Sequence, residues 1–287
     1  MIKDILKTMK INHYVKNLIV FVPLIFSMNI FNLTALKSSV FIFISFCLIS
    51  SAVYVMNDII DIEKDKQHPI KCKRPIARGK ISKIQAIILF FVLTLSSLLI
   101  PSNQLCHLFI VLYLVLNICY SKWLKSVPLV DVVCIALGFI FRILAGCVAI
   151  HVIASPLVIL LTFFFSMFFT FSKRKLELLL IKNKNEYRDS IKGYNLEMVN
   201  QFILMNAILT IAFYFTYMLD ETTIKRAGTE FLYISVIPFS MIILRLLYQV
   251  NTIQTADDPV NFIYKDKMTK IFIGLYLITL IILLTIS

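Results

Sequence analysis

The chain has 287 residues, of which 59% are hydrophobic, and its mean hydropathy is +0.86. These values lie far outside the usual range for soluble domains and indicate an integral membrane protein. The formal net charge of +13 would suit nucleic-acid binding, so the distribution of the basic residues has to decide how that charge is used.

Nine apolar segments are long enough to be considered as helices crossing ~30 Å of hydrocarbon. The predicted spans cover residues 17–34, 38–57, 82–101, 104–121, 127–149, 153–172, 199–219, 229–250 and 269–286. The first is interrupted by Pro23, which membrane helices tolerate when neighbouring groups re-satisfy the backbone. No cleavable signal peptide is expected, because this apolar run continues without a small-residue cleavage site. The sequence therefore predicts one all-α, polytopic domain over residues 1–287.

Positive charge is strongly biased to one side of these predicted spans. The amino-terminal arm, the loops after spans two, four, six and eight, and the first two residues of the spans that follow those loops hold 24 of the 29 Lys and Arg residues. Basic loops are typical of the cytoplasmic face, so we expect a multi-pass protein of the inner, cytoplasmic membrane with a cytoplasmic amino terminus. Topology and anionic lipid head groups account for the positive charge, and no nucleic-acid partner is expected.

The cysteines and histidines indicate no metal or disulfide framework. The six Cys are scattered without a C-x-x-C pair, and the four His are equally dispersed. These cysteines are interpreted as small apolar residues.

An acidic group follows the second apolar segment directly, in "NDIIDIEKDKQHP" (57–69). If the helix continues past the membrane, Asn57, Asp61 and Asp65 lie on one stripe, with Asp58 three residues before Asp61. Like charges on one stripe repel, and a hard divalent cation such as Mg²⁺, which binds through one or two carboxylates and substrate phosphates, would offset that repulsion. A solvated helix end paired with nearby lysines is the alternative.

A dense basic segment, "HPIKCKRPIARGK" (68–80), comes immediately afterwards. Carboxylates that hold a metal, next to Lys and Arg side chains that hold phosphate oxygens, make the two halves of a diphosphate site. The chain has no G-x-x-x-x-G-K-[ST] loop, so a P-loop nucleotide site is excluded.

"NDIIDIEKD" fits N-D-x-x-D-x-x-x-D and resembles the first signature of the UbiA superfamily of intramembrane prenyltransferases. The resemblance implies nine transmembrane helices around a central cavity open to the cytoplasmic side, and a diphosphate bound through Mg²⁺. Other segments resemble the decaprenyl-phosphate (polyprenyl-phosphate) phosphoribosyltransferase branch. They are "HYVKNLIVFVPLIF" (13–26), "HPIKCKRPIARGKIS" (68–82), "YSKWLKSVPLVDVVCIALGFIFRILAG" (120–146), "KRKLEL" (173–178) and "DDPVNFIYKD" (257–266).

The loop after predicted span six departs from the aromatic prenyltransferases. Those enzymes usually carry a second acidic D-x-x-x-D motif there, whereas this loop opens with Lys173, Arg174 and Lys175, with Glu177 nearby. The branch resemblance implies a donor, 5-phosphoribosyl diphosphate, and a lipid acceptor, a polyprenyl phosphate. It also implies a role in bacterial cell-envelope synthesis. A phosphate acceptor is already anionic near pH 7, so it needs no general base.

The predicted site follows from the motifs and this resemblance together. Asp58, Asp61 and Asp65 are the expected Mg²⁺ ligands and catalytic residues. The other expected substrate-binding residues are Lys16, Asn57, Lys71, Arg74, Arg78, Tyr120, Lys122, Asp131, Arg142, Lys173, Arg174 and Glu177. Arg142 lies well inside a span, where an Arg needs a partner or a cavity; both remain open. Arg245 is expected to snorkel, and Asp257, Asp258 and Asp266 either border the cavity or lie in loops.

Two other functions remain as alternatives. One is a prenyltransferase that moves a polyprenyl chain from its diphosphate to an aromatic acceptor, against which the missing second acidic motif argues. The other is a non-enzymatic transporter, whose ion-binding acids would be expected near the bilayer midplane on broken helices. The sequence leaves homo-oligomerisation open.

Overall fold

The structure is a computed structural model, and it describes residues 2–67, 71–101, 103–180, 189–252 and 266–285. The described residues form helices and connecting turns, without a strand. Each of the nine predicted spans contains a helix. Among the described residues, seven helices are long and apolar enough to cross a membrane, and the apolar helices Ile11–Phe26 and Lys83–Leu99 are shorter. The chain is thus an all-helical, polytopic membrane protein, but a count of nine crossings is not confirmed.

The helices group into two compact units, and the boundaries fall within and beside α7 (Val130–Ala149). The first unit comprises Met1–Lys122 and Phe141–Ala154, and the second comprises Trp123–Ile140 and Ser155–Ser287. The expected central cavity would involve more than either unit alone, and so it stays a prediction, as does the single domain.

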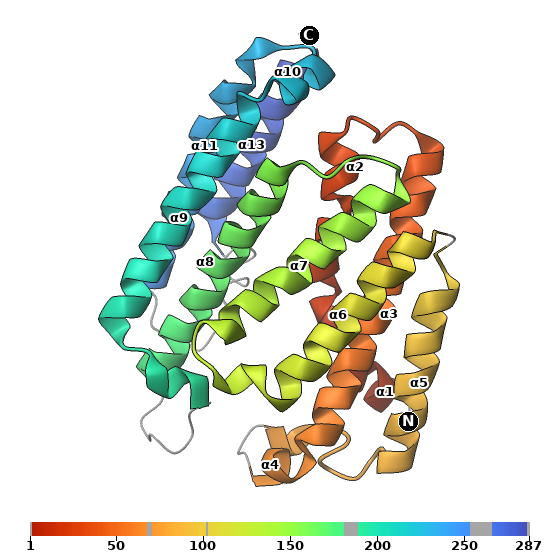
Figure 1. Cartoon of the computed structure of the whole chain (residues 1–287). Coiled ribbons are helices and arrows are strands. Elements are labelled where there is room, and N and C mark those ends of the chain that lie inside the picture. The colour runs from red at the N-terminus through yellow and green to blue at the C-terminus, as the bar shows by residue number, and fades with distance from the viewer. Residues whose placement is uncertain (1, 68–70, 102, 181–188, 253–265, 286–287) are drawn as a thin grey trace. The chain divides into compact units, whose positions relative to one another are not determined.

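In the first unit, α3 (Leu33–Ile60) is the central helix, against which α5 (Lys83–Leu99) and α6 (Gln104–Lys122) pack (Figure 1). The shorter elements are α1 (Ile2–Met9), η1 (Ile11–Phe21), α2 (Val22–Phe26), α4 (Ile62–Gln67) and η2 (Lys71–Lys73). The apolar core includes Phe46, Ile49 and Ile110, each fully buried. Its packing fixes the end of α3 that carries the aspartates.

The first predicted span, 17–34, is wrong at its carboxyl-terminal end. The helical segment ends at Phe26, and α3 begins at Leu33. The side chain of Asn32 accepts hydrogen bonds from the backbone N–H groups of Thr34 and Ala35, at 3.0 and 3.2 Å. Because an Asn in this position satisfies the first free donors of a helix, it starts a new helix and does not end the old one.

In the second unit, α8 packs along α9, and α11 packs against both α9 and α13. The elements are η3 (Leu124–Ser126), the first half of α7, α8 (Pro156–Leu180), η5 (Asp189–Gly193), α9 (Leu196–Met218), α10 (Glu221–Ala227), η6 (Glu230–Ser235), α11 (Val236–Thr252) and α13 (Lys267–Thr285). Phe168, Phe171 and Ile243 are among its buried core residues. Some of the phenylalanines of the Phe-rich segment of α8 therefore pack inside this unit.

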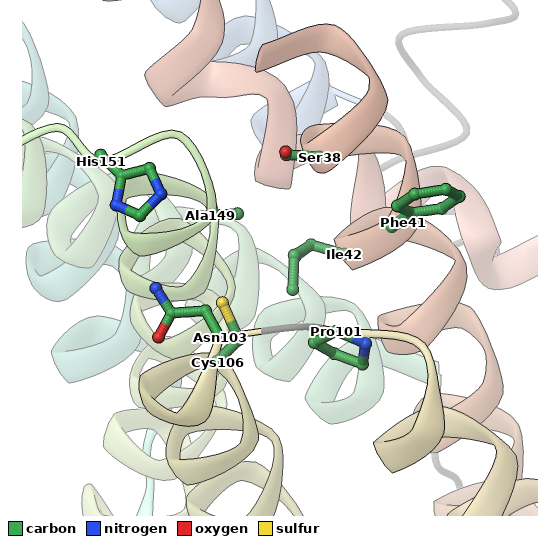
Figure 2. A pocket seen from close by; sticks show the side chains of 8 residues that line it. All are labelled: Ser38, Phe41, Ile42, Pro101, Asn103, Cys106, Ala149 and His151. Carbon is green, nitrogen blue, oxygen red and sulfur yellow. The ribbon is translucent and has the colours of Figure 1, made fainter. Parts of the chain in front are cut away.

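A small pocket of about 80 Å³ lies in the first unit, at the end of α3 away from the aspartates (Figure 2). Its lining residues are Ser38, Phe41, Ile42, Pro101, Asn103, Cys106, Ala149 and His151. Ser38 and Asp58 are twenty residues apart on α3, which places them about 30 Å from each other along the helix axis. This pocket is therefore separate from the acidic residues.

Candidate functional site

The acidic motif lies where α3 passes into α4. α3 ends at Ile60 with Asp61 as its carboxyl-terminal cap, yet the helical hydrogen bonds continue across this junction. The N–H of Asp61 donates to the carbonyl of Asn57 at 3.0 Å, and the N–H of Asp65 donates to the carbonyl of Asp61 at 2.8 Å. Asp58 and Asp65, two helical turns apart, are therefore on one face, and both are buried, at 2% and 3% exposure.

Arg74 joins these two aspartates. Its Nη1 donates to Oδ1 of Asp58 at 3.0 Å and to Oδ2 of Asp65 at 2.7 Å. Nζ of Lys10 contacts the same Oδ1 of Asp58 at 3.1 Å. We call Lys10, Asp58, Asp65 and Arg74 the Asp58 cluster. The expected stripe of carboxylates is thus accompanied by two cations in the structure.

Lys10 is a member that the motifs did not predict. It lies just beyond the end of α1, 48 residues from Asp58 in sequence, so no local spacing connects the two. Burial lowers the pKa of Lys10, and the adjacent Asp58 carboxylate opposes that shift. Nζ of Lys10 also lies 4.7 Å from the ring centre of Tyr54. A basic residue at the end of an amphipathic arm was the available signal, but it is a weak one.

The Asp58 cluster fits a Mg²⁺ ion held by two carboxylates. Oδ2 of Asp58 is buried and has no hydrogen-bond partner among the described residues. One nitrogen of Arg74 contacts both carboxylates, so the two are placed to share a cation. The described residues contain no group of three His, Cys, Asp or Glu side chains positioned for a metal. The arrangement therefore suits the mode in which Mg²⁺ takes one or two carboxylates, with waters and phosphates completing its shell.

The other predicted residues of the first unit differ in exposure. The side chain of Asn57 accepts a hydrogen bond from Ser121 Oγ, which ties α3 to the end of α6. Arg78 is exposed and lies 3.7 Å from Asp4 of α1. Half-buried side chains are those of Lys16, Asp61, Lys71 and Tyr120, whereas Lys122 is exposed. The substrate-binding roles of these residues stay predictions.

Arg142 is buried in a polar network inside the first unit. Its Nε donates to Oδ1 of Asn17 at 2.7 Å, and its Nη2 donates to the hydroxyl of Tyr113 at 2.9 Å. Its guanidinium carbon lies 4.5 Å from the ring centre of Tyr113, and Nη2 is 3.4 Å from Ser50 Oγ. Arg142 therefore connects α7 with η1, α3 and α6. An arginine inside a predicted span needs polar partners or a cavity, and here Asn17, Tyr113 and Ser50 are its partners. These contacts are consistent with a structural role.

We expect Arg142→Met to lower the thermal stability of the purified protein, because Asn17 Oδ1 loses its charged donor in a buried place. Hydrogen bonds to charged groups contribute about 1.5–3 kcal/mol each. Arg142→Lys, which keeps the charge but not the planar donor arrangement, is expected to restore part of that stability. The measurement is the midpoint of thermal aggregation in detergent, and a midpoint equal to that of the wild type for Arg142→Met would contradict the role.

In the second unit, Arg174 lies between two of the predicted carboxylates. Its Nε and Nη2 contact Oδ2 of Asp131 at 3.0 and 2.9 Å, and its Nη1 donates to Glu177 at 2.6 Å. Asp131 also accepts from Ser190 Oγ at 3.2 Å and from the Tyr194 hydroxyl at 2.9 Å. These five residues form the Arg174 cluster. Arg174 and Asp131 are buried, at 1% and 0% exposure.

The Arg174 cluster fixes two loops of the second unit. The N–H of Leu129 donates to the Tyr194 hydroxyl at 2.5 Å, so the turn before α7 and the segment before α9 meet at Asp131. Burial raises the pKa of Tyr194, which keeps its hydroxyl protonated as a donor. Arg174 and Asp131 hold these two loops together, and their substrate-binding roles stay predictions. A phosphate would have to compete with two carboxylates for Arg174.

The neighbouring lysines differ in exposure. Lys173 is exposed, whereas Lys175 is buried and donates to Oδ1 of Asn251 at 2.5 Å. Arg245, which is expected to snorkel, pairs with Asp266 through two contacts of 3.0 and 2.9 Å. Asp266 also caps α13 by accepting from the N–H of Thr269 at 2.7 Å. Asp257 and Asp258 lie outside the described residues.

The fold and the candidate site describe an all-helical membrane protein with buried clusters of acidic and basic side chains. The family model for the UbiA prenyltransferase family matches residues 20–265. The chain therefore belongs to the UbiA prenyltransferase family. Membership of this family supports the interpretation of the protein as a transferase.

Several known proteins are similar to this chain. An uncharacterised protein of Sinorhizobium fredii is 29% identical over 95% of this chain, which spans only 54% of that protein's length. The decaprenyl-phosphate phosphoribosyltransferase of Mycolicibacterium smegmatis is 29% identical over 80% of this chain and 74% of its own. A UbiA homologue from Archaeoglobus fulgidus, solved bound to DMAPP and Mg²⁺, is 15% identical and has a TM-score of 0.70 over 99% of this chain and 100% of that chain. The structural likeness shows the fold.

Proposed function

We propose that this protein transfers the 5-phosphoribosyl group from 5-phosphoribosyl diphosphate to a polyprenyl phosphate. The lipid phosphate oxygen forms a bond to the anomeric carbon, the bond from that carbon to the diphosphate oxygen breaks, and diphosphate leaves. The product is polyprenyl-phosphoryl-5-phosphoribose. Relatives named as decaprenyl-phosphate phosphoribosyltransferases support this reaction.

The observation that carries the proposal is the basic character of the segment after the apolar part of α8. An aromatic prenyltransferase is expected to use a second acidic motif there, but here both nearby carboxylates, Asp131 and Glu177, are paired with Arg174. Lys173 remains exposed beside them. A cationic segment suits a donor with an additional phosphate better than it suits a second metal ion.

Mg²⁺, held by Asp58 and Asp65 with Asp61 as a further candidate ligand, would neutralise the charge that develops on the leaving diphosphate. The protein's own residues position the substrates. Arg74, Lys71 and Arg78 are proposed to bind the diphosphate, and Asn57 the ribose. For Lys16 we propose contact with one of the phosphates.

Lys173 is proposed to bind the 5-phosphate of the donor. We expect Lys173→Met to raise the KM for 5-phosphoribosyl diphosphate about tenfold with little change in kcat, because the contact is the same in the ground state and the transition state. Steady-state kinetics in detergent or nanodiscs measures this split. Lys225→Met is the matched control, since Lys225 is exposed and paired with Glu221. An unchanged KM for Lys173→Met would contradict the assignment.

A diphosphate-release assay tests the reaction as a whole. Purified protein, Mg²⁺ and 5-phosphoribosyl diphosphate are expected to release diphosphate only after a short polyprenyl phosphate is added, and EDTA should stop the release. Release that does not depend on the lipid phosphate would contradict group transfer to that acceptor.

The distribution of basic residues supports a cytoplasmic amino terminus and a location in a bacterial inner membrane. In that orientation the end of α3 that carries Asp58 faces the cytoplasm, where a water-soluble phosphorylated donor would be available. Cysteine accessibility at the exposed Lys7 and Lys80 positions tests this, with labelling expected from the cytoplasmic side.

A further inference from the structure

Lys10, the residue that follows α1, contributes a cation to the candidate metal site. α1 packs against α3, and its amphipathic sequence "IKDILKTM" exposes Ile2 and Leu6, at 71% and 44%. The chain turns at Lys10, whose φ of 52° lies in the left-handed region that residues other than glycine seldom adopt. After this turn, Nζ of Lys10 contacts Asp58. Lys10 therefore has both an uncommon backbone conformation and an ion pair with Asp58.

The Asp58 cluster is electrically balanced in the structure. Lys10 and Arg74 supply two positive charges, and Asp58 and Asp65 supply two negative charges. Both cations contact the same atom, Oδ1 of Asp58, at 3.1 and 3.0 Å. The second oxygen of Asp58 is buried and has no hydrogen-bond partner among the described residues. Lys10 and Arg74 already neutralise the two carboxylates. A divalent ion that binds alone would therefore be repelled by these two positive charges, which would remain nearby.

A metal–diphosphate complex avoids this repulsion, because it brings negative charge together with the metal ion. The metal ion can take the carboxylate oxygens, while the freed ammonium and guanidinium groups take phosphate oxygens, for which both have suitable donors. Every charge then keeps a partner of opposite sign. In a largely buried site this matters, because an unpaired charge there is costly.

We propose that Lys10 is an exchangeable counter-ion of the Asp58 cluster: with Arg74, it neutralises the aspartates before substrate binds and passes to the diphosphate when the metal–diphosphate complex arrives. This inference rests on the proposed function, because it assumes that Asp58 and Asp65 hold the metal ion. It assigns to Lys10 a specificity role, the rejection of free metal in favour of metal bound to diphosphate.

The consequence is a thermodynamic coupling between metal and diphosphate. Couplings of this kind commonly change an affinity by about 5- to 150-fold. The wild-type protein is expected to bind the preformed Mn²⁺–diphosphate complex at least about tenfold more tightly than free Mn²⁺. Removing the charge of Lys10 should strengthen the binding of free Mn²⁺ about tenfold, because a cation no longer competes at Asp58. It should also weaken binding of the complex, so that the ratio of the two dissociation constants falls toward one.

The experiment measures Mn²⁺ binding by electron paramagnetic resonance without turnover, in purified protein with no lipid acceptor. Each protein is titrated with MnCl₂ alone and with the preformed Mn²⁺–diphosphate complex. Lys10→Gln is the test variant, and Lys10→Arg, which keeps the charge, is expected to preserve the wild-type ratio. Lys7→Gln is the matched control, because Lys7 lies on α1, three residues before Lys10, and is exposed. Size-exclusion chromatography confirms that each variant is folded.

The outcomes separate this inference from the proposed function. If wild type binds both forms of Mn²⁺ and Lys10→Gln gives the wild-type ratio, the counter-ion role of Lys10 is wrong while the metal site stands. If a fall in the ratio is equally large for Lys7→Gln, the effect is one of net charge and the assignment to Lys10 is overturned. If wild type binds neither form, the metal assignment and the inference both fail.

Discussion

Asp58→Asn is expected to reduce turnover about 10²–10³-fold or more, in the range found when one stabilising group for developing charge is removed. Asn keeps the shape of the side chain but replaces one carboxylate oxygen by an amide nitrogen, and it removes the negative charge that Arg74 contacts at Oδ1 and that we propose Mg²⁺ binds. The loss should appear in kcat and should not be recovered at high donor concentration. Asp61→Asn and Asp65→Asn are expected to have losses of similar size.

The matched control is Glu63→Gln, which removes one carboxylate from the same acidic segment. Glu63 is 81% exposed and pairs with Lys66, so we expect its activity to stay within about twofold of wild type, as is usual for surface substitutions. Near-normal turnover of a folded Asp58→Asn protein would remove the metal assignment. A comparable loss in Glu63→Gln would show that overall charge, and not the Asp58 cluster, determines activity.

Arg174→Met is expected to be the most destabilising single change considered. Its guanidinium is 1% exposed and pairs with Asp131, which is fully buried, and removing one partner from such a pair typically costs about 3–5 kcal/mol. The remaining Asp131 carboxylate would keep Ser190 and Tyr194 as donors but would have lost its counter-charge. The measurement is the midpoint of thermal unfolding of the purified protein, together with the yield of the monodisperse form.

A double variant separates the pair from its surroundings. Arg174→Met with Asp131→Leu removes both charges, and apolar replacement of a buried pair is often close to neutral, so stability should recover relative to Arg174→Met. Arg245→Met is the control variant, because the side chains of Arg245 and its partner Asp266 are 29% and 18% exposed. We expect only a small loss of thermal stability in this variant. A similar loss in Arg174→Met and Arg245→Met would contradict the argument from burial.

The local parts of the fold and the site were predictable from the sequence. Long apolar runs set the main helices. Helical spacing predicted a stripe of Asn57, Asp61 and Asp65 with Asp58 beside it, and in the structure Arg74 contacts two of these residues, Asp58 and Asp65. Local polar residues explain where the prediction failed. Asn32 caps the start of α3, so it belongs to the next helix and not to the first predicted span.

Long-range pairing was beyond the reach of the sequence pattern. Lys10 and Asp58 are 48 residues apart, and Arg142 and Asn17 are 125 residues apart, so no periodicity relates them. Arg174 was identified as a basic residue of the site, yet its burial between Asp131 and Glu177 depends on how α8 packs beside the start of α7. Charge type can be derived from the sequence, whereas the partner of each charge comes from packing.

A donor-swap assay with the purified protein and Mg²⁺ distinguishes phosphoribosyl transfer from prenyl transfer to an aromatic acid. One reaction contains 5-phosphoribosyl diphosphate and a short polyprenyl phosphate, and the other contains a prenyl diphosphate and an aromatic acid. Mass spectrometry is expected to find a lipid-linked phosphoribose, with an equal amount of diphosphate, in the first reaction and no prenylated acid in the second. A prenylated aromatic acid in the second reaction, with no lipid-linked phosphoribose in the first, would contradict the proposed function.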